Sequence, residues 1–226
     1  MGVQYTKKRR RAAKKAVRTA LALLLAAIVT LGGIFAARAI HEARLRAEYV
    51  PLTTDEIDIA RLKGEAAETD PARLSVARSA LSLVGKVHYF WGGKSLVLGW
   101  DSRWGQLTQV WAAGSQTTGT YRPYGLDCSG FVDWVFYNAS GGTYVIGHGG
   151  GAYAQHTYCT DIPWSEAQPG DLAFYPEDEH IGIVGGRDED GNLLVIHCAS
   201  GSLNNVVITG ASGFVAIATP QFYGEE

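Results

Sequence analysis

A cysteine followed along the chain by two histidines is the part of this sequence best suited to catalysis. Cys128 stands at the start of a predicted helix over 128–138, and His180 and His197 lie on segments predicted to be strands. The positive end of a helix favours thiolate over thiol, which makes the sulfur a better nucleophile at neutral pH. A histidine beside it can take the proton, and a second polar group can orient that histidine. This order of residues indicates a cysteine hydrolase, whose chemistry needs no metal or other cofactor.

The two histidines can meet only if the hairpin joining their strands has the right register. If Gly186 pairs with Gly191, His180 lies directly opposite His197 on the same face of the sheet. A two-residue turn at Asp190 and Gly191 instead separates the two histidines by about 13 Å of strand rise. The chemistry favours the first register and the turn propensity favours the second. We expect the first.

Four parts of the chain resemble motifs of the NlpC/P60 cysteine peptidases, which cut the stem peptides of bacterial peptidoglycan. They occur in the family's order, and together they span residues 70–222. The resemblance implies a papain-like arrangement, in which the nucleophile helix packs against an antiparallel sheet. The motifs are Tyr89-Phe90-Trp91-Gly92-Gly93, Asp127-Cys128-Ser129-Gly130-Phe131-Val132, Pro169-Gly170-Asp171-Leu172, and the two histidine segments His180-Ile181-Gly182-Ile183-Val184-Gly185 and Val195-Ile196-His197.

The resemblance implies cleavage of the bond from γ-D-glutamate to L-lysine or another diamino acid. In that mechanism Cys128 attacks the amide carbonyl, and His180 takes the thiol proton and later protonates the leaving amine. His197 orients His180 and balances its charge. The backbone N–H of Cys128 can donate to the oxyanion, because it lies at a helix N-terminus.

The resemblance also assigns a substrate-binding role to three polar residues. Asp127, Ser129 and Tyr89 would bind the free amine at the N-terminus of the substrate. Asp127 has an alternative role as the cap of the nucleophile helix. Tyr89 could instead direct its hydroxyl to the oxyanion.

Charge is distributed unevenly along the 226 residues. Residues 1–50 contain 11 Lys/Arg and 2 Asp/Glu, whereas residues 51–226 contain 9 and 20, so the net charge of −2 conceals a basic start and an acidic remainder. An acidic domain is poorly suited to nucleic acid, because that binding needs Lys and Arg to displace counterions. Hydrophobic residues make up 46% of the chain, enough for a core. We therefore expect one folded domain plus an N-terminal segment.

The basic start precedes an apolar run that predicts a transmembrane helix. Residues 1–18 form the expected cytoplasmic segment, and residues 19–37 are uncharged and close to the roughly 20 residues that span hydrocarbon. The positive flank favours a single-pass anchor in the cell membrane with the catalytic domain outside the cytoplasm. A cleaved signal peptide is the alternative, because Ala37-Arg38-Ala39 has the form of a cleavage site, and the domain would then be secreted. Both place the domain where peptidoglycan is.

A stalk is expected between the membrane helix and the catalytic domain. It covers residues 38–69, and the catalytic domain covers 70–226. Thr53 and Glu56 have the spacing of a capping box, which predicts a short helix over 54–63 inside the stalk.

The catalytic domain is predicted to be α+β, because helices precede a series of consecutive strands. Asp70 followed by Pro71 predicts the start of a helix that runs to residue 84. Residues 141–169 are rich in glycine and are expected to form a loop. The expected strands, each bounded by turn residues, are Asp171–Tyr175, His180–Val184, Leu193–Cys198, Val206–Thr209 and Phe214–Ala218.

An aromatic-rich insertion over residues 94–126 separates the first two motifs. The link between these motifs is usually shorter in the family. One interpretation is a small satellite core, and the other is a wall of the substrate cleft that stacks on a sugar or covers a peptide. The aromatic residues are Trp100, Trp104, Trp111, Tyr121 and Tyr124.

The remaining cysteines and histidines do not form a recognisable site. Cys159 and Cys198 could pair, but buried free thiols are the simpler expectation. Cys198 follows His197 on a strand and should point to the opposite face. His148, His156 and Cys159 have spacings that match no standard zinc site, so no metal is expected.

Three functions are consistent with these residues. The leading one is an anchored cell-wall hydrolase, with the peptidoglycan stem peptide and the membrane as partners. The second is a related thiol amidase or acyltransferase on another amide or ester. The third is a catalytically decayed, wall-associated assembly factor. The sequence identifies no protein partner.

Overall fold

The computed structural model describes residues 2–48 and 56–224, which belong to two separate units. The first unit is the single helix α1 (Gly2–Glu48). Its stretch Val17–Arg44 is apolar and long enough to cross a membrane, and none of that stretch is buried within the protein. The helix continues through residues 38–48, which were expected to be the start of the stalk.

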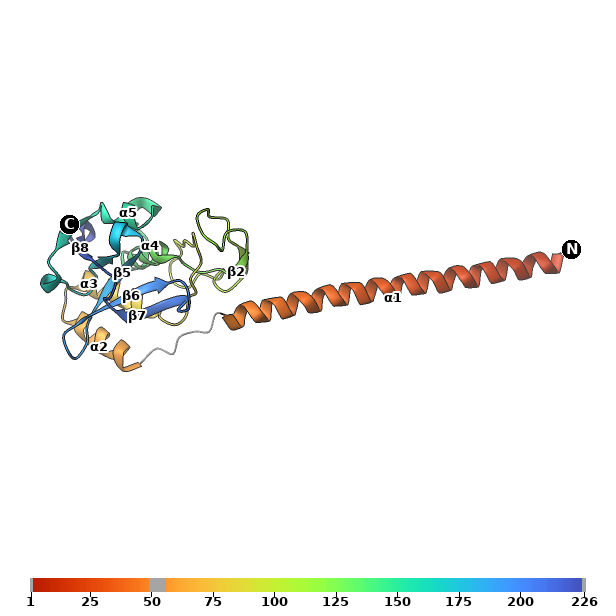
Figure 1. The fold of residues 1–226 in the computed structure, drawn as a ribbon, viewed down its shortest axis with the longest axis horizontal. Coiled ribbons are helices and arrows are strands. Elements are labelled where there is room, and N and C mark those ends of the chain that lie inside the picture. The colour runs from red at the N-terminus through yellow and green to blue at the C-terminus, as the bar shows by residue number, and fades with distance from the viewer. Residues whose placement is uncertain (1, 49–55, 225–226) are drawn as a thin grey trace. The chain divides into compact units, whose positions relative to one another are not determined.

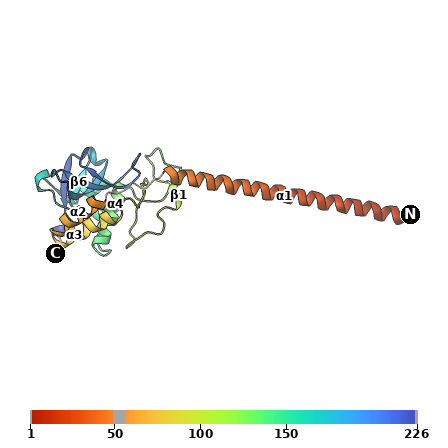
Figure 2. The same ribbon diagram turned by 90° about the horizontal axis from the view of Figure 1, so that it is seen from below.

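The second unit is an α+β domain built on a six-stranded antiparallel sheet, which confirms the predicted fold class. Three helices, α2 (Glu56–Ala67), α3 (Pro71–Ser82) and α4 (Cys128–Ala139), pack together and against β5 on one face of the sheet (Figure 2). In spatial order the strands are β3 (Cys159–Ile162), β8 (Ala216–Pro220), β4 (Leu172–Phe174), β5 (Ile181–Arg187), β6 (Leu193–Ala199) and β7 (Asn205–Gly210). Figure 1 labels β5, β6, β7 and β8 of this sheet.

Helix α4 is the central helix of the core. It starts at Cys128 as predicted, and its side chains pack between α3 and the strands β5 and β6. Burying apolar side chains of this size contributes about 1.5–3 kcal/mol each. The five residues expected to face inward are all buried: Phe131, Val132, Trp134, Val135 and Phe136.

The start of α3 is also as predicted. The Asp70 side chain accepts hydrogen bonds from the backbone N–H groups of Ala72 and Arg73, each at 2.9 Å, and Pro71 occupies the first turn. Arg73 in turn reaches Asp171, at the start of β4, at 2.8 Å, in a pair that is almost fully buried. The cap therefore also fixes α3 to the sheet.

The expected stalk is wrong over its second half, because α2 belongs to the folded domain. Leu62 and Ala66 are completely buried, and Leu62 is part of the main core cluster. Glu65 accepts a hydrogen bond from the backbone N–H of Arg187 in β5 at 2.8 Å. The capping box was placed at Thr53, which lies outside the described residues. The packing of α2 on β5 could not be seen in the sequence, because β5 lies more than a hundred residues later.

The segment 141–169 is not simply a loop. It contains the short helix α5 (Ala152–His156) and the edge strand β3, together with two 3₁₀ turns. The segment shows no clear alternation of apolar and polar residues, because β3 is only half-buried. Its pairing partner is β8, the last strand of the chain. This segment matters for the site because it closes one side of the cleft described below.

The insertion 94–126 is ordered, with a two-stranded sheet formed by β1 (Leu107–Gln109) and β2 (Tyr121–Pro123). Trp104 is buried against Trp134 of α4, with ring centroids 5.7 Å apart. Asp101 is buried and accepts hydrogen bonds from Ser95 and from the guanidinium of Arg103, which lower its pKa to about 2. These contacts join the insertion to the main core, of which Trp104 is a member, whereas Trp100, Trp111 and Tyr121 are exposed, so the separate satellite core of the first interpretation does not form.

Candidate active site

Cys128 is the first residue of α4, and its position is set by the residue before it. The Asp127 side chain caps the helix by accepting a hydrogen bond from the backbone N–H of Gly130 at 2.6 Å. The sulfur is therefore at the positive end of a helix. The alternative capping role of Asp127 is confirmed.

The Trp-Gly-Gly segment holds the start of α4 by direct contact between main chains. The carbonyl of Gly93 accepts the backbone N–H of Asp127 at 3.1 Å, and Phe90 donates to the carbonyl of Leu126 at 2.9 Å. A Cβ added at Gly93 would lie 2.3 Å from the carbonyl oxygen of Gly125, and one added at Gly130 would lie 2.0 Å from the carbonyl oxygen of Gly93. Glycine is needed here because the backbones approach too closely for a side chain.

The Cys128 thiol is buried, and this outweighs the effect of the helix. Its side chain is among the buried core residues, and burial and the nearby Asp127 carboxylate raise the pKa of the thiol to about 11. The backbone N–H groups of Ser129 and Ile181 act in the opposite direction by donating to the sulfur. The expectation of a thiolate at neutral pH is therefore wrong for this state, and the sulfur rests as a thiol.

The two histidines meet, although not in the register we expected. His180 Nε2 lies 2.8 Å from His197 Nδ1. Strand β5 pairs with β6 through Ile183 opposite Ile196, and a bulge follows at Val184. This register does not place the two histidines directly opposite one another.

The histidines reach each other diagonally, and a glycine makes this possible. Gly182 faces the strand position of His197, since a Cβ at Gly182 would lie 2.9 Å from the Cβ of His197. His180 lies two residues earlier, so its side chain leaves the same face of the strand. Without a side chain at Gly182, the His180 ring can extend across to His197.

A hydrogen-bond chain sets the tautomers of both rings. The Thr209 hydroxyl donates to the carbonyl of Gly210 at 3.0 Å, so it accepts from His197 Nε2 at 2.9 Å. His197 Nδ1 is then unprotonated and accepts from His180 Nε2. This leaves His180 Nδ1 as a free base. Thr209 was missed by sequence reasoning, because its only signal was an alternating position on the next strand.

Both imidazoles are held neutral by burial. Burial lowers the pKa of His180 to about 4. Burial also lowers the pKa of His197 to about 3, and the neighbouring His180 contributes to this second shift. Tyr175 packs edge-on against the His180 ring with a centroid 5.0 Å away, and Phe214 lies tilted to it at 6.0 Å. Both rings are therefore unprotonated at neutral pH, so His180 is present in its base form.

The Cys128 sulfur lies against the start of β5, the strand that follows His180. The N–H that the Cys128 sulfur accepts belongs to Ile181, the residue after His180. Among the described residues, no hydrogen bond joins Cys128 to His180. Catalytic hydrogen bonds often tighten only when substrate is bound.

The three residues expected to bind a substrate amine lie around the sulfur. Ser129 is buried and donates to Asp127 Oδ1 at 3.0 Å. Burial and the proximity of Cys128 and Asp127 raise the pKa of Tyr89, so its hydroxyl stays protonated. The structure thus brings together the predicted residues Tyr89, Asp127, Cys128 and Ser129.

Lys94, which sequence reasoning did not select, lies against the same residues. Its Nζ donates to Asp127 Oδ1 at 3.1 Å and to Ser129 Oγ. It also lies 3.7 Å from Asp133 Oδ2, a buried carboxylate whose pKa is raised by burial to about 7. Gln155 donates to the other Asp133 oxygen at 2.8 Å. Lys94 directly follows the Trp-Gly-Gly motif, which was the available signal.

A cleft opens at Cys128 between the insertion and the segment 149–153. Ala112 and Ala113 of the insertion form part of its wall, but the insertion's aromatic residues, which the second interpretation placed in this wall, are not among its lining residues. Trp91 lies on the same wall and is fixed there because its indole N–H donates to the carbonyl of Ala113 at 2.8 Å. The remaining lining residues are Gly92, Lys94, Asp127, Cys128, Ser129, Gly149, Gly150, Gly151, Ala152, Tyr153, Asp178 and Glu179.

Cys198 and His156 make contacts within the fold. Cys159 and Cys198 are free, and the buried Cys198 thiol donates to the carbonyl of Leu126 at 3.1 Å. His156 stacks on Phe174 and is bonded to Asp161 and Asp178. Within residues 2–48 and 56–224, no group of His, Cys, Asp and Glu could hold a metal ion.

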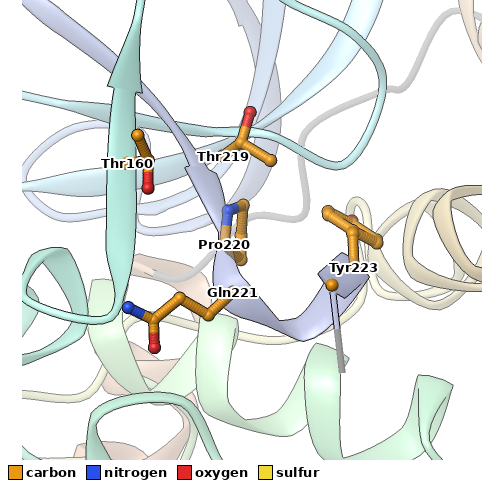
Figure 3. Close-up of a pocket in the computed structure, with 6 residues that line it drawn as sticks. Thr160, Thr219, Pro220, Gln221 and Tyr223 are labelled. Carbon is orange, nitrogen blue, oxygen red and sulfur yellow. The ribbon is translucent and has the colours of Figure 1, made fainter. Parts of the chain in front are cut away.

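A second hollow lies between β3, β8 and the C-terminal turn. Figure 3 shows its labelled lining residues, which include neither cysteine nor histidine. The hollow therefore lacks the nucleophile and base found at Cys128. Its lining residues are Thr160, Thr219, Pro220, Gln221, Tyr223 and Gly224.

The family model for NlpC/P60 matches residues 86–211, more than half of the chain. The chain belongs to the NlpC/P60 family. The match begins just before Tyr89, includes Cys128, His180 and His197, and ends after Thr209. No curated protein matches this chain. The folded domain of this NlpC/P60 member also includes α2, α3 and β8, which lie outside the residues that the family model matches.

Several solved structures are similar to this NlpC/P60 chain. The peptidoglycan hydrolase RipB from Mycobacterium tuberculosis is 22% identical with a TM-score of 0.44, over 80% of this chain and 83% of that one. The NlpC/p60 domain of the peptidoglycan hydrolase SagA is 22% identical with a TM-score of 0.43, over 67% and 99%. RipD from M. tuberculosis, described as a non-catalytic NlpC/p60 protein adapted to peptidoglycan binding, is 17% identical with a TM-score of 0.44, over 67% and 98%. The family assignment rests on the matched residues 86–211 alone.

Proposed function

We propose that this protein is a cysteine peptidase that cleaves peptidoglycan stem peptides after γ-D-glutamate. The observation that supports this most is the hydrogen-bond chain that leaves His180 Nδ1 as a free base next to the segment that contacts the Cys128 sulfur. Membership of the NlpC/P60 family makes peptidoglycan the expected substrate. The scissile bond joins γ-D-glutamate to L-lysine or another diamino acid.

Catalysis begins from a neutral pair, because the thiol has a raised pKa and the imidazole a lowered one. The Cys128 sulfur attacks the amide carbonyl as its proton passes to His180 Nδ1. The resulting imidazolium is stabilised through Nε2–H by His197, which is itself held by Thr209. His180 then gives the proton to the leaving amine, and a thioester remains on Cys128. Water, deprotonated by His180, hydrolyses the thioester.

The negative charge on the carbonyl oxygen needs donors at the start of α4. The backbone N–H of Cys128 belongs to the first turn of the helix, where N–H groups have no partner within the helix. Tyr89 stays protonated and can donate its hydroxyl to the same oxygen. Losing one such donor typically costs about 10²- to 10³-fold in kcat.

The N-terminal helix α1 serves as the membrane anchor in this proposal. Residues 1–18 stay in the cytoplasm, residues 19–37 cross the membrane, and the catalytic domain acts on the wall outside. If the segment is instead cleaved as a signal, the same domain is secreted. N-terminal sequencing of the mature protein separates the two, since cleavage would give a chain that starts near Ile40.

Product analysis tests the activity. The full chain, in detergent, is incubated with purified muropeptides, and the products are identified by mass spectrometry beside the Cys128→Ala variant. New fragments ending in γ-D-glutamate, absent with the variant, would support the proposal. Transfer of the acyl group to an added amine without hydrolysis would indicate an acyltransferase. Binding of muropeptide without cleavage would indicate a wall-associated factor.

The pH dependence should reflect the lowered pKa of His180. The pKa of His180 in the folded protein is about 4. The ring therefore stays unprotonated as the pH falls, and it becomes protonated only near its pKa. We expect kcat/KM on a stem peptide to be nearly unchanged between pH 7.5 and pH 5. A histidine with an ordinary pKa of about 6.5 would lose about 30-fold over this range. A loss of that size, with the fold intact by circular dichroism, would show that the base is not held neutral.

Thr209 should affect the rate through the tautomer of His197. Thr209→Val removes the acceptor for His197 Nε2–H, so the ring can turn its proton to Nδ1 and no longer accept from His180. We expect a fall of about tenfold in kcat with little change in KM, similar to the loss of the outer hydrogen-bond partner of other functional histidines. Thr209→Ser keeps the hydroxyl and should restore the rate. Equal rates for Thr209→Val and Thr209→Ser would show that the Thr209 hydroxyl does not influence catalysis through the hydrogen-bond chain.

A further inference from the structure

Lys94 places an ammonium group of the protein where the substrate's amine was expected to bind. Its Nζ donates to Asp127 at 3.1 Å and to Ser129, and lies 3.5 Å from the carbonyl of Gly150. A third side chain, Asp133, lies 3.7 Å away. Two of the groups that would recognise a free amine are therefore already engaged by Lys94.

The insertion fixes the main chain of Lys94. The Tyr124 hydroxyl donates to the Lys94 carbonyl at 2.6 Å, and Arg103 approaches the same oxygen at 3.5 Å. Arg103 is itself held by the buried Asp101 at 2.6 Å. The Lys94 side chain is one-third exposed and lines the cleft beside Cys128. It is thus an ordered part of the cleft wall, held at both its main chain and its ammonium.

We propose that Lys94 determines which substrates are accepted, because its ammonium group already binds Asp127 and Ser129. The enzyme then accepts stem peptides whose N-terminal amine is acylated. This inference rests on the peptidase function proposed above. A free substrate ammonium at this position meets a like charge and has to displace Lys94. An acylated nitrogen carries no charge and has no such cost. A stem peptide is acylated while it is attached to the glycan, so the enzyme acts on intact wall rather than on released peptides.

The cleft around Lys94 suits an uncharged extension. The surrounding wall includes Trp91, Ala112, Ala113 and the segment Gly149–Gly151, all of which are uncharged. The acidic lining residues outside the lysine cluster are Asp178 and Glu179, and Asp178 is bonded to His156 at 2.8 Å. An aromatic and small-residue wall provides contact for an acyl group or sugar without a charge requirement.

The test compares one stem tetrapeptide in its free and N-acetylated forms. The full chain should cleave the acetylated form at least as fast as the free form, by kcat/KM. Lys94→Ala should shift the ratio by about tenfold toward the free peptide, because Asp127 and Ser129 become available to its ammonium. Lys94→Arg keeps a cation and should keep the wild-type ratio. Faster cleavage of the free form by the wild type, or an unchanged ratio in Lys94→Ala, would overturn the inference.

Two controls complete the experiment. Lys86→Ala removes an exposed lysine whose Nζ donates to the carbonyl of Ser82 at 2.8 Å, and should leave the ratio unchanged. Lys94→Met keeps most of the side-chain volume and replaces Lys94→Ala if the latter loses its cooperative unfolding transition.

Binding to the Cys128→Ala protein separates this inference from the activity. If the wild type cuts neither peptide, the proposed function fails. The role of Lys94 is then tested separately, by calorimetric measurement of the affinity of each peptide for the Cys128→Ala protein. Binding of the acetylated peptide at least as tightly as the free one would support the inference. Tighter binding of the free peptide, or binding of neither, would overturn it.

Discussion

Replacing His180 with alanine is expected to lower kcat on a stem peptide by about a thousandfold, within the range for loss of a general base. The effect should be large because the Cys128 thiol has a pKa of about 11 and cannot ionise at neutral pH without a partner. The imidazole that takes this proton has a pKa of about 4, so it is fully available as a base. Initial rates of the full chain on muropeptides, with product quantified by chromatography, measure the effect.

The double variant Cys128→Ala/His180→Ala gives this prediction its sharpest form. Residues that act as one unit are not additive, so the double variant should be no slower than Cys128→Ala alone. His41→Ala, an exposed histidine on α1, is the matched control and should keep the wild-type rate. If His180→Ala retained more than about a tenth of the rate, another group would have to be the base.

Sequence reasoning was most successful where the signal is local. The start of α4 at Cys128 and the cap at Asp127 follow from a handful of consecutive residues, and the structure has both. The meeting of His180 and His197 was predicted correctly from the requirement of a shared strand face, although the register was not. A bulge after Val184 changes the pairing, and neither simple turn allowed for it.

The hairpin loop explains why turn propensity was misleading. Asp188 accepts hydrogen bonds from the backbone N–H groups of Asp190 and Asn192, at 3.0 and 2.7 Å, and so organises a longer loop. The Asp190–Gly191 turn that residue propensity favoured is absorbed into this loop. Hydrogen bonds from a side chain to nearby backbone groups depend on the conformation of the loop, and turn propensities do not account for them.

The parts that could not be predicted depend on distant contacts. Lys94 meets Asp127 and Ser129 only because the Trp-Gly-Gly segment lies across the start of α4. Leu62 was placed in a stalk because α2 packs on β5, more than a hundred residues later, as well as on the neighbouring α3. The resting state of Cys128 was also misjudged, because a helix terminus is visible in sequence whereas the burial that outweighs it is not.

Replacing Gly130 with alanine is expected to destabilise the catalytic domain. The new Cβ would lie 2.0 Å from the carbonyl oxygen of Gly93, and that oxygen already accepts the backbone N–H of Asp127. Overpacking against backbone costs about 3 kcal/mol at the upper end of the usual range. The better helix propensity of alanine returns about 1 kcal/mol. The net loss of about 2 kcal/mol should lower Tm by about 4–8 °C for a domain of this size.

Differential scanning calorimetry of the full chain measures this shift, and Gly64→Ala is the matched control. Gly64 lies within α2 with no atom within 4 Å of its added Cβ, so alanine there gains helix propensity without a clash. Its expected effect has the opposite sign, a gain of up to about 1 kcal/mol. The two variants carry the same chemical change in a helix, so the difference between them isolates the contact with Gly93. If both raised Tm, the Trp-Gly-Gly segment would not be pressed against the start of α4, and the position of Cys128 would need another support.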